Sequence, residues 1–190
     1  RFSSEKHPAA ELLEKYFRDV YGFTLDLTGV AFPGRHGFPA WMASPPELNE
    51  DVIMARVTAY FKVNPYSWKT PISQNINREL EQKRPEGLYV FAHRGGDEPD
   101  DIHRGKSYDD AMAQNLTFLN PKEYLLASGF HRYIKRYFMD RKRWTRTSSL
   151  WSDGSLVRGY WYDAYAELYL SRSDRDDRDP DYGPREAVFA

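Results

Sequence analysis

Apolar side chains recur every three to four residues in several segments of the chain, a pattern that predicts helices. Four of these segments carry proline at or near the first helical position, where the missing N–H costs no hydrogen bond. Two weaker segments follow, one after the capping pair Ser107 and Asp110 and one from Ser155. The pattern predicts about six helices, over residues 8–21, 47–63, 71–84, 108–119, 121–144 and 155–172.

Evidence for strands is sparse. Residues 23–30 (FTLDLTGV) alternate with period two, and residues 87–93 (GLYVFAH) form a short apolar run. The segment between the first predicted strand and the second helix, AFPGRHGFPAWMASPP, is rich in Gly and Pro and is expected to be a loop. With about six helices and two short strands, we expect a mainly α fold, with α+β as the alternative.

The C-terminal residues follow a different pattern. From Ser171 onward Asp and Arg alternate, and Pro180 and Pro184 exclude a continuous helix. Such a segment lacks the apolar surface to fold alone. We therefore expect a single helical domain over residues 1–170 and an extended polar C-terminal arm over residues 171–190, whose anchors in a partner would be Tyr182, Val188 and Phe189.

Composition excludes several classes of site. The chain of 190 residues has no Cys, so thiolate zinc sites, iron–sulfur clusters and cysteine nucleophiles are ruled out. No apolar run approaches the roughly 20 residues that a membrane-spanning helix needs. Aromatic residues make up 16% of the chain, and Tyr and Trp favour surfaces half buried against a partner. These features favour a protein that binds other proteins.

One apolar run ends in a motif with possible chemistry. His93, Arg94 and Gly95 after a predicted strand resemble the first motif of glycerophosphodiester phosphodiesterases, which implies a TIM barrel and metal-assisted hydrolysis. The second carboxylate motif of that family is missing, because Asp100 and Asp101 follow Pro99, and the motif lies mid-chain. The chain is therefore not assigned to the family.

A metal site without that family is the alternative for the same loop. Imidazole and carboxylate ligands are offered by His93, Asp97, Asp101 and His103, although their spacing fits no established signature. This alternative would make the chain a small metal-dependent hydrolase or phosphodiesterase. We otherwise expect no catalytic residue, metal or cofactor.

The most basic segment runs from His131 to Arg146 and holds seven Lys or Arg against one acid, Asp140. On one long helix it would present a basic-aromatic interaction face formed by Arg132, Lys135, Arg136, Arg141, Lys142, Arg143 and Trp144. Such a face suits an acidic protein, anionic lipid headgroups or RNA. The net charge of −1 makes nucleic acid the least favoured. Acids in 97–101 and 174–181 are its expected partners within the chain.

The first residues bear on localisation. Arg1, Phe2, Ser3 and Ser4 resemble the residues around the cleavage point of a mitochondrial targeting peptide, so a mitochondrial protein is expected. Together these patterns predict a non-catalytic accessory subunit of a large assembly, in particular a mitochondrial respiratory complex or ATP synthase. Its partners would be other subunits, with a peripheral position at the membrane. An RNA-contacting mitochondrial ribosomal subunit is the remaining alternative.

Overall fold

The computed structural model describes residues 6–190 and shows an α+β fold, so the expected mainly α fold is wrong. The described part contains five α-helices: α1 (Ala10–Tyr21), α2 (Glu50–Phe61), α3 (Ile72–Asn75), α4 (Tyr108–Ala113) and α5 (Pro121–Lys135). It also contains eight strands: β1 (Ala40–Ser44), β2 (Asn64–Ser67), β3 (Tyr89–His93), β4 (Trp144–Leu150), β5 (Leu156–Tyr162), β6 (Glu167–Ser173), β7 (Tyr182–Pro184) and β8 (Ala187–Phe189). The segment Arg1–Ser4, on which the mitochondrial expectation rests, lies outside the described residues.

Helices with strong local capping signals are confirmed. The Asn120 side chain accepts from the Glu123 backbone N–H at 2.8 Å, and the Glu123 carboxylate accepts from the Asn120 N–H at 2.9 Å, which starts α5. Ser107 and Asp110 form the same reciprocal box at α4. Helices α1 and α2 also lie where they were predicted. α5 stops at Lys135, because Arg136 adopts a left-handed φ of 73°, so the predicted helix over 121–144 is too long.

Two predicted helices and one predicted strand are wrong. Residues 71–84 form only the short α3 and a separate 3-10 turn at Arg78–Leu80, and residues 23–30 contain no strand. Residues 155–172 form the strand pair β5 and β6 instead of a helix. In β5 the buried and outward positions alternate, with Val157, Gly159 and Trp161 buried and with Arg158, Tyr160 and Tyr162 outward. Leu156, Tyr160 and Trp161 of the same segment also fall at helical spacing, and pairing with β6 selects the strand.

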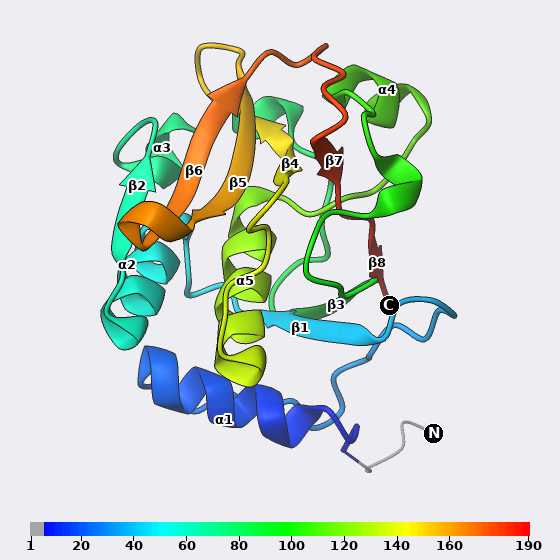
Figure 1. Ribbon diagram of the computed structural model, residues 1–190. Helices are drawn as coiled ribbons and strands as arrows, with labels where there is room; N and C mark the ends of the chain where they lie inside the picture. The colour runs from blue at the N-terminus through cyan, green and yellow to red at the C-terminus, as the bar shows by residue number, and fades with distance from the viewer. Residues whose placement is uncertain (1–5) are drawn as a thin grey trace.

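The strands form two sheets (Figure 1). A three-stranded antiparallel sheet has the order β1-β3-β8, which confirms the strand expected in 87–93 and adds β1 in the Gly/Pro-rich segment. A five-stranded sheet has the order β2-β6-β5-β4-β7, with β2 and β7 running parallel to their neighbours. α5 packs against β1, β4 and β5, and therefore joins the two sheets.

Residues 171–190 complete both sheets instead of forming an extended arm. β7 pairs with β4 in the larger sheet, and β8 pairs with β3 in the smaller one. The Asp- and Arg-rich link between β6 and β7 is tied to α4 by ion pairs, Arg175 to Asp109 at 2.6 Å and Arg178 to Asp110 at 2.8 Å. Within this link, Arg175, Arg178 and Asp181 are exposed and paired with other parts of the chain.

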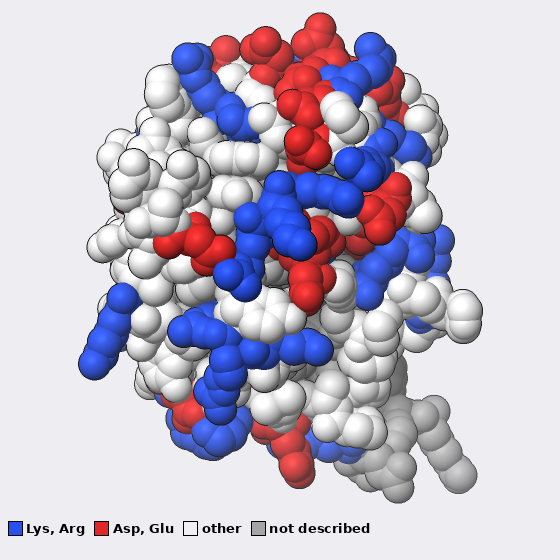
Figure 2. All heavy atoms as spheres, in the orientation of Figure 1, with Lys and Arg blue, Asp and Glu red and all other residues white. Residues whose placement is uncertain are grey.

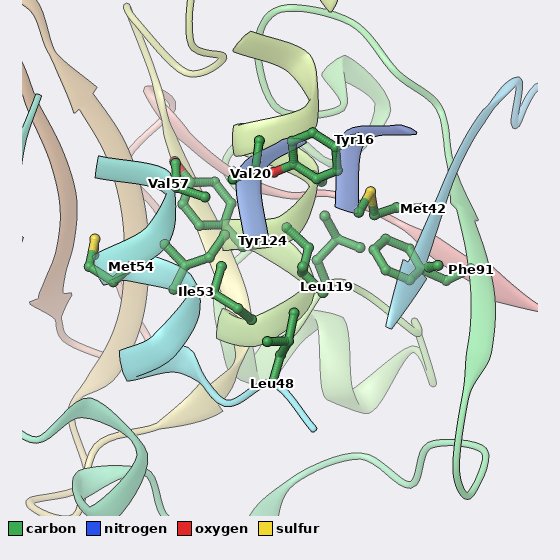
Figure 3. Close-up of a cluster of buried hydrophobic side chains, with 14 of the residues drawn as sticks. Tyr16, Val20, Met42, Leu48, Ile53, Met54, Val57, Phe91, Leu119 and Tyr124 are labelled. Atoms are coloured by element: carbon green, nitrogen blue, oxygen red, sulfur yellow. The ribbon is translucent and has the colours of Figure 1, made fainter. Parts of the chain in front are cut away.

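The main core lies where α1, α2, α5 and the two sheets meet (Figure 3). Tyr124 of α5 is fully buried and packs on Gly159 of β5, where an added Cβ would lie 2.1 Å from the Tyr124 ring. Glycine at this position therefore lets α5 approach the inner face of the larger sheet. Within residues 6–190, every helix is too short or too polar to cross a lipid bilayer.

Candidate functional site

The outer face of the five-stranded sheet carries at least one aromatic side chain from each strand. Strand pairing sets Tyr66 of β2 opposite Tyr169 of β6, and Tyr169 opposite Tyr160 of β5. The β4–β5 register places Trp144 beside Tyr160, and Trp144 pairs with Tyr182 of β7. We call this line across the sheet the aromatic row: Tyr66, Tyr169, Tyr160, Trp144 and Tyr182.

The rings of the aromatic row stack on one another. The Tyr66 and Tyr169 centroids are 4.1 Å apart with planes 18° apart, and those of Trp144 and Tyr160 are 4.4 Å apart with planes 16° apart. Tyr182 meets Trp144 edge-on at 6.3 Å. All five side chains are half-buried. Stacked cross-strand pairs of this kind stabilise an exposed sheet face and hold the rings in fixed positions.

Two further tyrosines, at the end of β5 and in the turn between β5 and β6, extend this surface. Tyr162 lies 5.9 Å from Tyr169 and stacks on Tyr165, whose side chain is 63% exposed. Burial, followed by a hydrogen bond to Glu167, raises the pKa of Tyr169 to about 12, so its phenol is neutral at physiological pH. In the view of Figure 2, the surface around β2, β5 and β6 is mostly free of charged side chains.

Arg158 lies within the aromatic row. Its guanidinium is 4.1 Å from the Trp144 ring centroid and 4.7 Å from that of Tyr182, both cation–π distances. No carboxylate within residues 6–190 forms an ion pair with Arg158, and its Nε is buried without a hydrogen-bond partner there. The strand register also sets it directly opposite Arg146. The aromatic row therefore contains a cation, Arg158, that has no ion-pair partner within residues 6–190.

Arg146 is held differently. It is fully buried and donates to the Asp177 backbone carbonyl at 2.7 Å, while the Asp177 carboxylate lies 3.7 Å away. Burial lowers the pKa of Arg146, and nearby Asp177 and Asp179 oppose that shift. The acids of the C-terminal link thus compensate Arg146 and leave Arg158 facing outward.

The expected basic-aromatic face is split between several surfaces. Because α5 ends at Lys135, the residues that follow turn away from the helix. Arg132, Arg136 and Arg141 line a shallow hollow of about 210 Å³ beside Asp163. Lys135 lines a different cavity, Lys142 is exposed, and Trp144 belongs to the aromatic row. Figure 2 shows Lys and Arg in separate groups with acidic side chains between them.

Acids of the 97–101 segment pair with the basic segment, as the sequence predicted. Asp101 binds Arg143 at 2.6 Å, and the Glu98 carboxylate accepts from the Arg143 backbone N–H at 2.9 Å. Arg141 pairs instead with Asp163 at 2.8 Å. Arg132 and Arg136 form no ion pair within residues 6–190. The described acids therefore neutralise part of the basic segment.

The four ligands of the alternative metal site have separate partners. His103 meets Glu186 at 3.1 Å, Asp101 meets Arg143, and Asp97 accepts from the Tyr137 hydroxyl at 3.0 Å. His93 is buried at the end of β3. Across residues 6–190 no three His, Asp or Glu side chains converge as a metal site.

The two other expected anchors lie in β8. Val188 and Phe189 are half-buried, and Phe189 packs 5.7 Å from the Tyr89 ring, with the Arg84 guanidinium 4.9 Å above it. Of the expected anchors, Tyr182 alone joins the aromatic row. Sequence reasoning missed Tyr66, Tyr160, Tyr169 and Arg158, although the alternation in residues 157–162 was the available signal.

Comparison with known proteins adds no relative. No protein-family model matches the chain, and no significant similarity is found to a curated protein or to a solved structure.

Proposed function

We propose that this chain is a non-catalytic, protein-binding subunit that docks an acidic segment of a partner protein on the aromatic row. The observation that supports the proposal most is the position of Arg158, an unpaired cation within residues 6–190 that lies among Trp144 and Tyr182 on an exposed sheet face. Tyr, Trp and Arg are the residue types that dominate binding energy at protein interfaces.

The charge of Arg158 favours a carboxylate in the partner. A docked protein would remove water from Arg158, and a buried guanidinium without a counter-charge is strongly destabilising. An Asp or Glu of the partner would accept a charge-assisted hydrogen bond from Arg158 and supply the missing counter-charge. Apolar side chains beside that carboxylate would pack on the ring edges of Tyr160 and Tyr169. Each of these rings is held in a stacked pair, with Trp144 and Tyr66 respectively.

The same geometry makes nucleic acid a weaker candidate. Single-stranded nucleic acid binds by stacking its bases on open aromatic faces. In the aromatic row the Tyr66 and Tyr169 rings cover each other, as do Trp144 and Tyr160, and Arg158 lies over Trp144. The surface therefore offers ring edges and hydroxyls, which suit a protein partner better.

Site-specific photo-cross-linking in the native host tests the proposal. A benzoylphenylalanine at position 165, beside the aromatic row, is expected to cross-link a specific protein, which mass spectrometry identifies. The same group at Tyr60 of α2 is the control, because Tyr60 is 44% exposed and lies outside the row. Binding of the purified partner is then measured by calorimetry with the wild type, Trp144→Ala and Arg158→Glu.

The expected result is a loss of affinity of about tenfold or more in both variants, with circular dichroism showing an intact fold. A lysine in place of the partner's contacting carboxylate is expected to restore binding to Arg158→Glu. Equal binding by all three proteins, or cross-links to RNA or lipid alone, contradicts the proposal. The mitochondrial location remains a prediction, which microscopy of a tagged chain checks.

A further inference from the structure

A cavity of about 310 Å³ lies away from the aromatic row, between α1, α5, the start of β1 and the end of β3. Its walls are largely apolar and include Leu12, Trp41, Phe130 and Ile134. The only polar atom of Trp41, its Nε1, donates to the Pro33 carbonyl at 2.9 Å, so the indole contributes apolar surface. The volume is at the lower end of the range for ligand pockets, about 300–1,000 Å³, and suits a single ring with a few further atoms.

His93 supplies a hydrogen-bond donor at the end of β3. Its Nδ1 accepts from the Gly95 backbone N–H at 3.2 Å, so the neutral ring carries its proton on Nε2. Burial, with a smaller contribution from Arg185, lowers the pKa of His93 to about 3. Gly95 and Gly96 follow with φ values of 74° and 78°, a turn that brings Asp97 to the cavity.

His131 of α5 lines the same cavity and is more than nine-tenths buried. Its Nε2 lies 3.4 Å from an Asp97 carboxylate oxygen and has no hydrogen-bond partner within residues 6–190. Burial and then Arg185 lower the pKa of His131 to about 4, while Asp97 opposes the shift. A buried polar atom without a partner is unusual in folded proteins, and this one lies on a residue that lines a cavity, where a ligand can supply the partner.

The charges around this cavity balance. Its lining from α1 and β1 is uncharged, α5 contributes His131 and Lys135, and the end of β3 contributes His93 and Asp97. Asp97 and Lys135 carry opposite charges, and the nearby Arg185 is paired with the buried Asp140. Asp97 and Lys135 are both exposed to solvent, so a charged ligand group beside the buried histidines would have no buried counter-charge, which is costly.

We infer that this cavity binds a neutral, mainly apolar molecule with one ring and one hydroxyl group, which hydrogen-bonds to His93 and His131. An alcohol or phenol both donates and accepts, so it matches two neutral imidazoles. The ring lies against Trp41, Phe130 and Ile134, and the hydroxyl displaces water from the histidines. This site is independent of the aromatic row.

Four one-ring probes of similar size, two neutral and two charged, test the inference by NMR titration of the ¹⁵N-labelled full chain at pH 7. Benzyl alcohol is expected to shift the amide signals around Gly95 and Ala127 and to bind about fivefold more tightly than toluene, which lacks the hydroxyl. Benzoate and benzylamine are expected to bind at least tenfold more weakly than benzyl alcohol. Equal affinity for all four probes, tighter binding of a charged probe, or no binding of benzyl alcohol overturns the inference.

Two sets of variants locate the binding. Ile134→Trp fills the cavity from an α5 position that is 44% exposed and is expected to abolish benzyl alcohol binding. Ile102→Trp, at a 63% exposed position outside the cavity, is the matched control and should bind normally. His131→Gln should reduce the preference for benzyl alcohol over toluene while toluene still binds. A preference that survives in both His131→Gln and His93→Gln overturns the assigned hydrogen bonds.

Discussion

Arg185 and Asp140 form an ion pair in which neither side chain has any exposed surface. Arg185 lies between β7 and β8, and Asp140 follows α5. The guanidinium also donates to the Thr145 hydroxyl and to the Gly95 carbonyl, each at 3.0 Å. Burial raises the pKa of Asp140 to about 6 despite Arg185, so the carboxylate is still ionised at neutral pH. Arg185 therefore connects three parts of the fold: the loop that follows α5, strand β4, and the turn that follows β3.

Removing one partner of this pair should be far worse than removing both. Arg185→Met leaves a buried carboxylate without a counter-charge and is expected to lower the free energy of unfolding by about 3–5 kcal/mol. Adding Asp140→Asn should recover part of that loss. Urea denaturation of the single and double variants measures the coupling. Arg175→Met, which breaks an exposed pair with Asp109, is the control and should change stability by less than about 1 kcal/mol. Strictly additive effects of the two buried substitutions would contradict the coupling.

Gly159→Ala should destabilise the fold through overpacking. The new Cβ would lie 2.1 Å from the buried Tyr124 ring, so α5 or β5 has to move. We expect a loss of about 1–3 kcal/mol or more in the free energy of unfolding, measured by urea denaturation. Gly34→Ala is the control, because Gly34 is exposed and an added Cβ there meets no atom within 4 Å. Equal stability of the two variants would show that α5 does not pack this closely.

The buried His93 should make the fold sensitive to acid. Its pKa falls from 6.5 to about 3 on folding, so between these values the unfolded chain binds a proton that the folded chain excludes. Stability is therefore lost as the pH falls below about 6.5, by about 2 kcal/mol at pH 5 from this residue. His93→Gln should reduce the difference in unfolding free energy between pH 7 and pH 5 by that amount, whatever its effect at pH 7. The exposed His36→Gln should leave the difference unchanged. An unchanged pH dependence in His93→Gln would mean that His93 is protonated in the fold.

Truncation distinguishes a structural C-terminus from a removable arm. Deleting residues 182–190 removes β7, β8 and Arg185, and leaves the buried Asp140 without its counter-charge. We expect loss of the cooperative thermal transition, followed by circular dichroism, because strand edges of both sheets become exposed. A truncated chain that still melts cooperatively near the wild-type temperature would show that the last strands add little to the fold.

Local signals predicted α1, α2, α4 and α5, and long-range pairing explains why residues 155–172 form strands instead of the predicted helix. Asn120 with Glu123 encodes the start of α5 within four residues, so no tertiary information is needed. The segment containing Leu156, Tyr160, Trp161 and Leu168 fits helical and strand periods alike, and only the register of β5 with β6 selects the strand. The aromatic row depends on four such registers, so no single segment contains it. The His93 cavity was beyond prediction for the same reason, because its second histidine comes from α5.

The placement of β7 and β8 has a consequence for how the chain is made. Synthesis proceeds from the N-terminus, so β7 and β8, which complete the two sheets, leave the ribosome after every other strand of those sheets. Until then β3 and β4 each lack a neighbour, and Asp140 lacks its arginine. Native assembly of both sheets therefore waits until β7 and β8 have been synthesised, and a nascent chain stalled before Arg185 would present unpaired strand edges to chaperones or to other nascent chains.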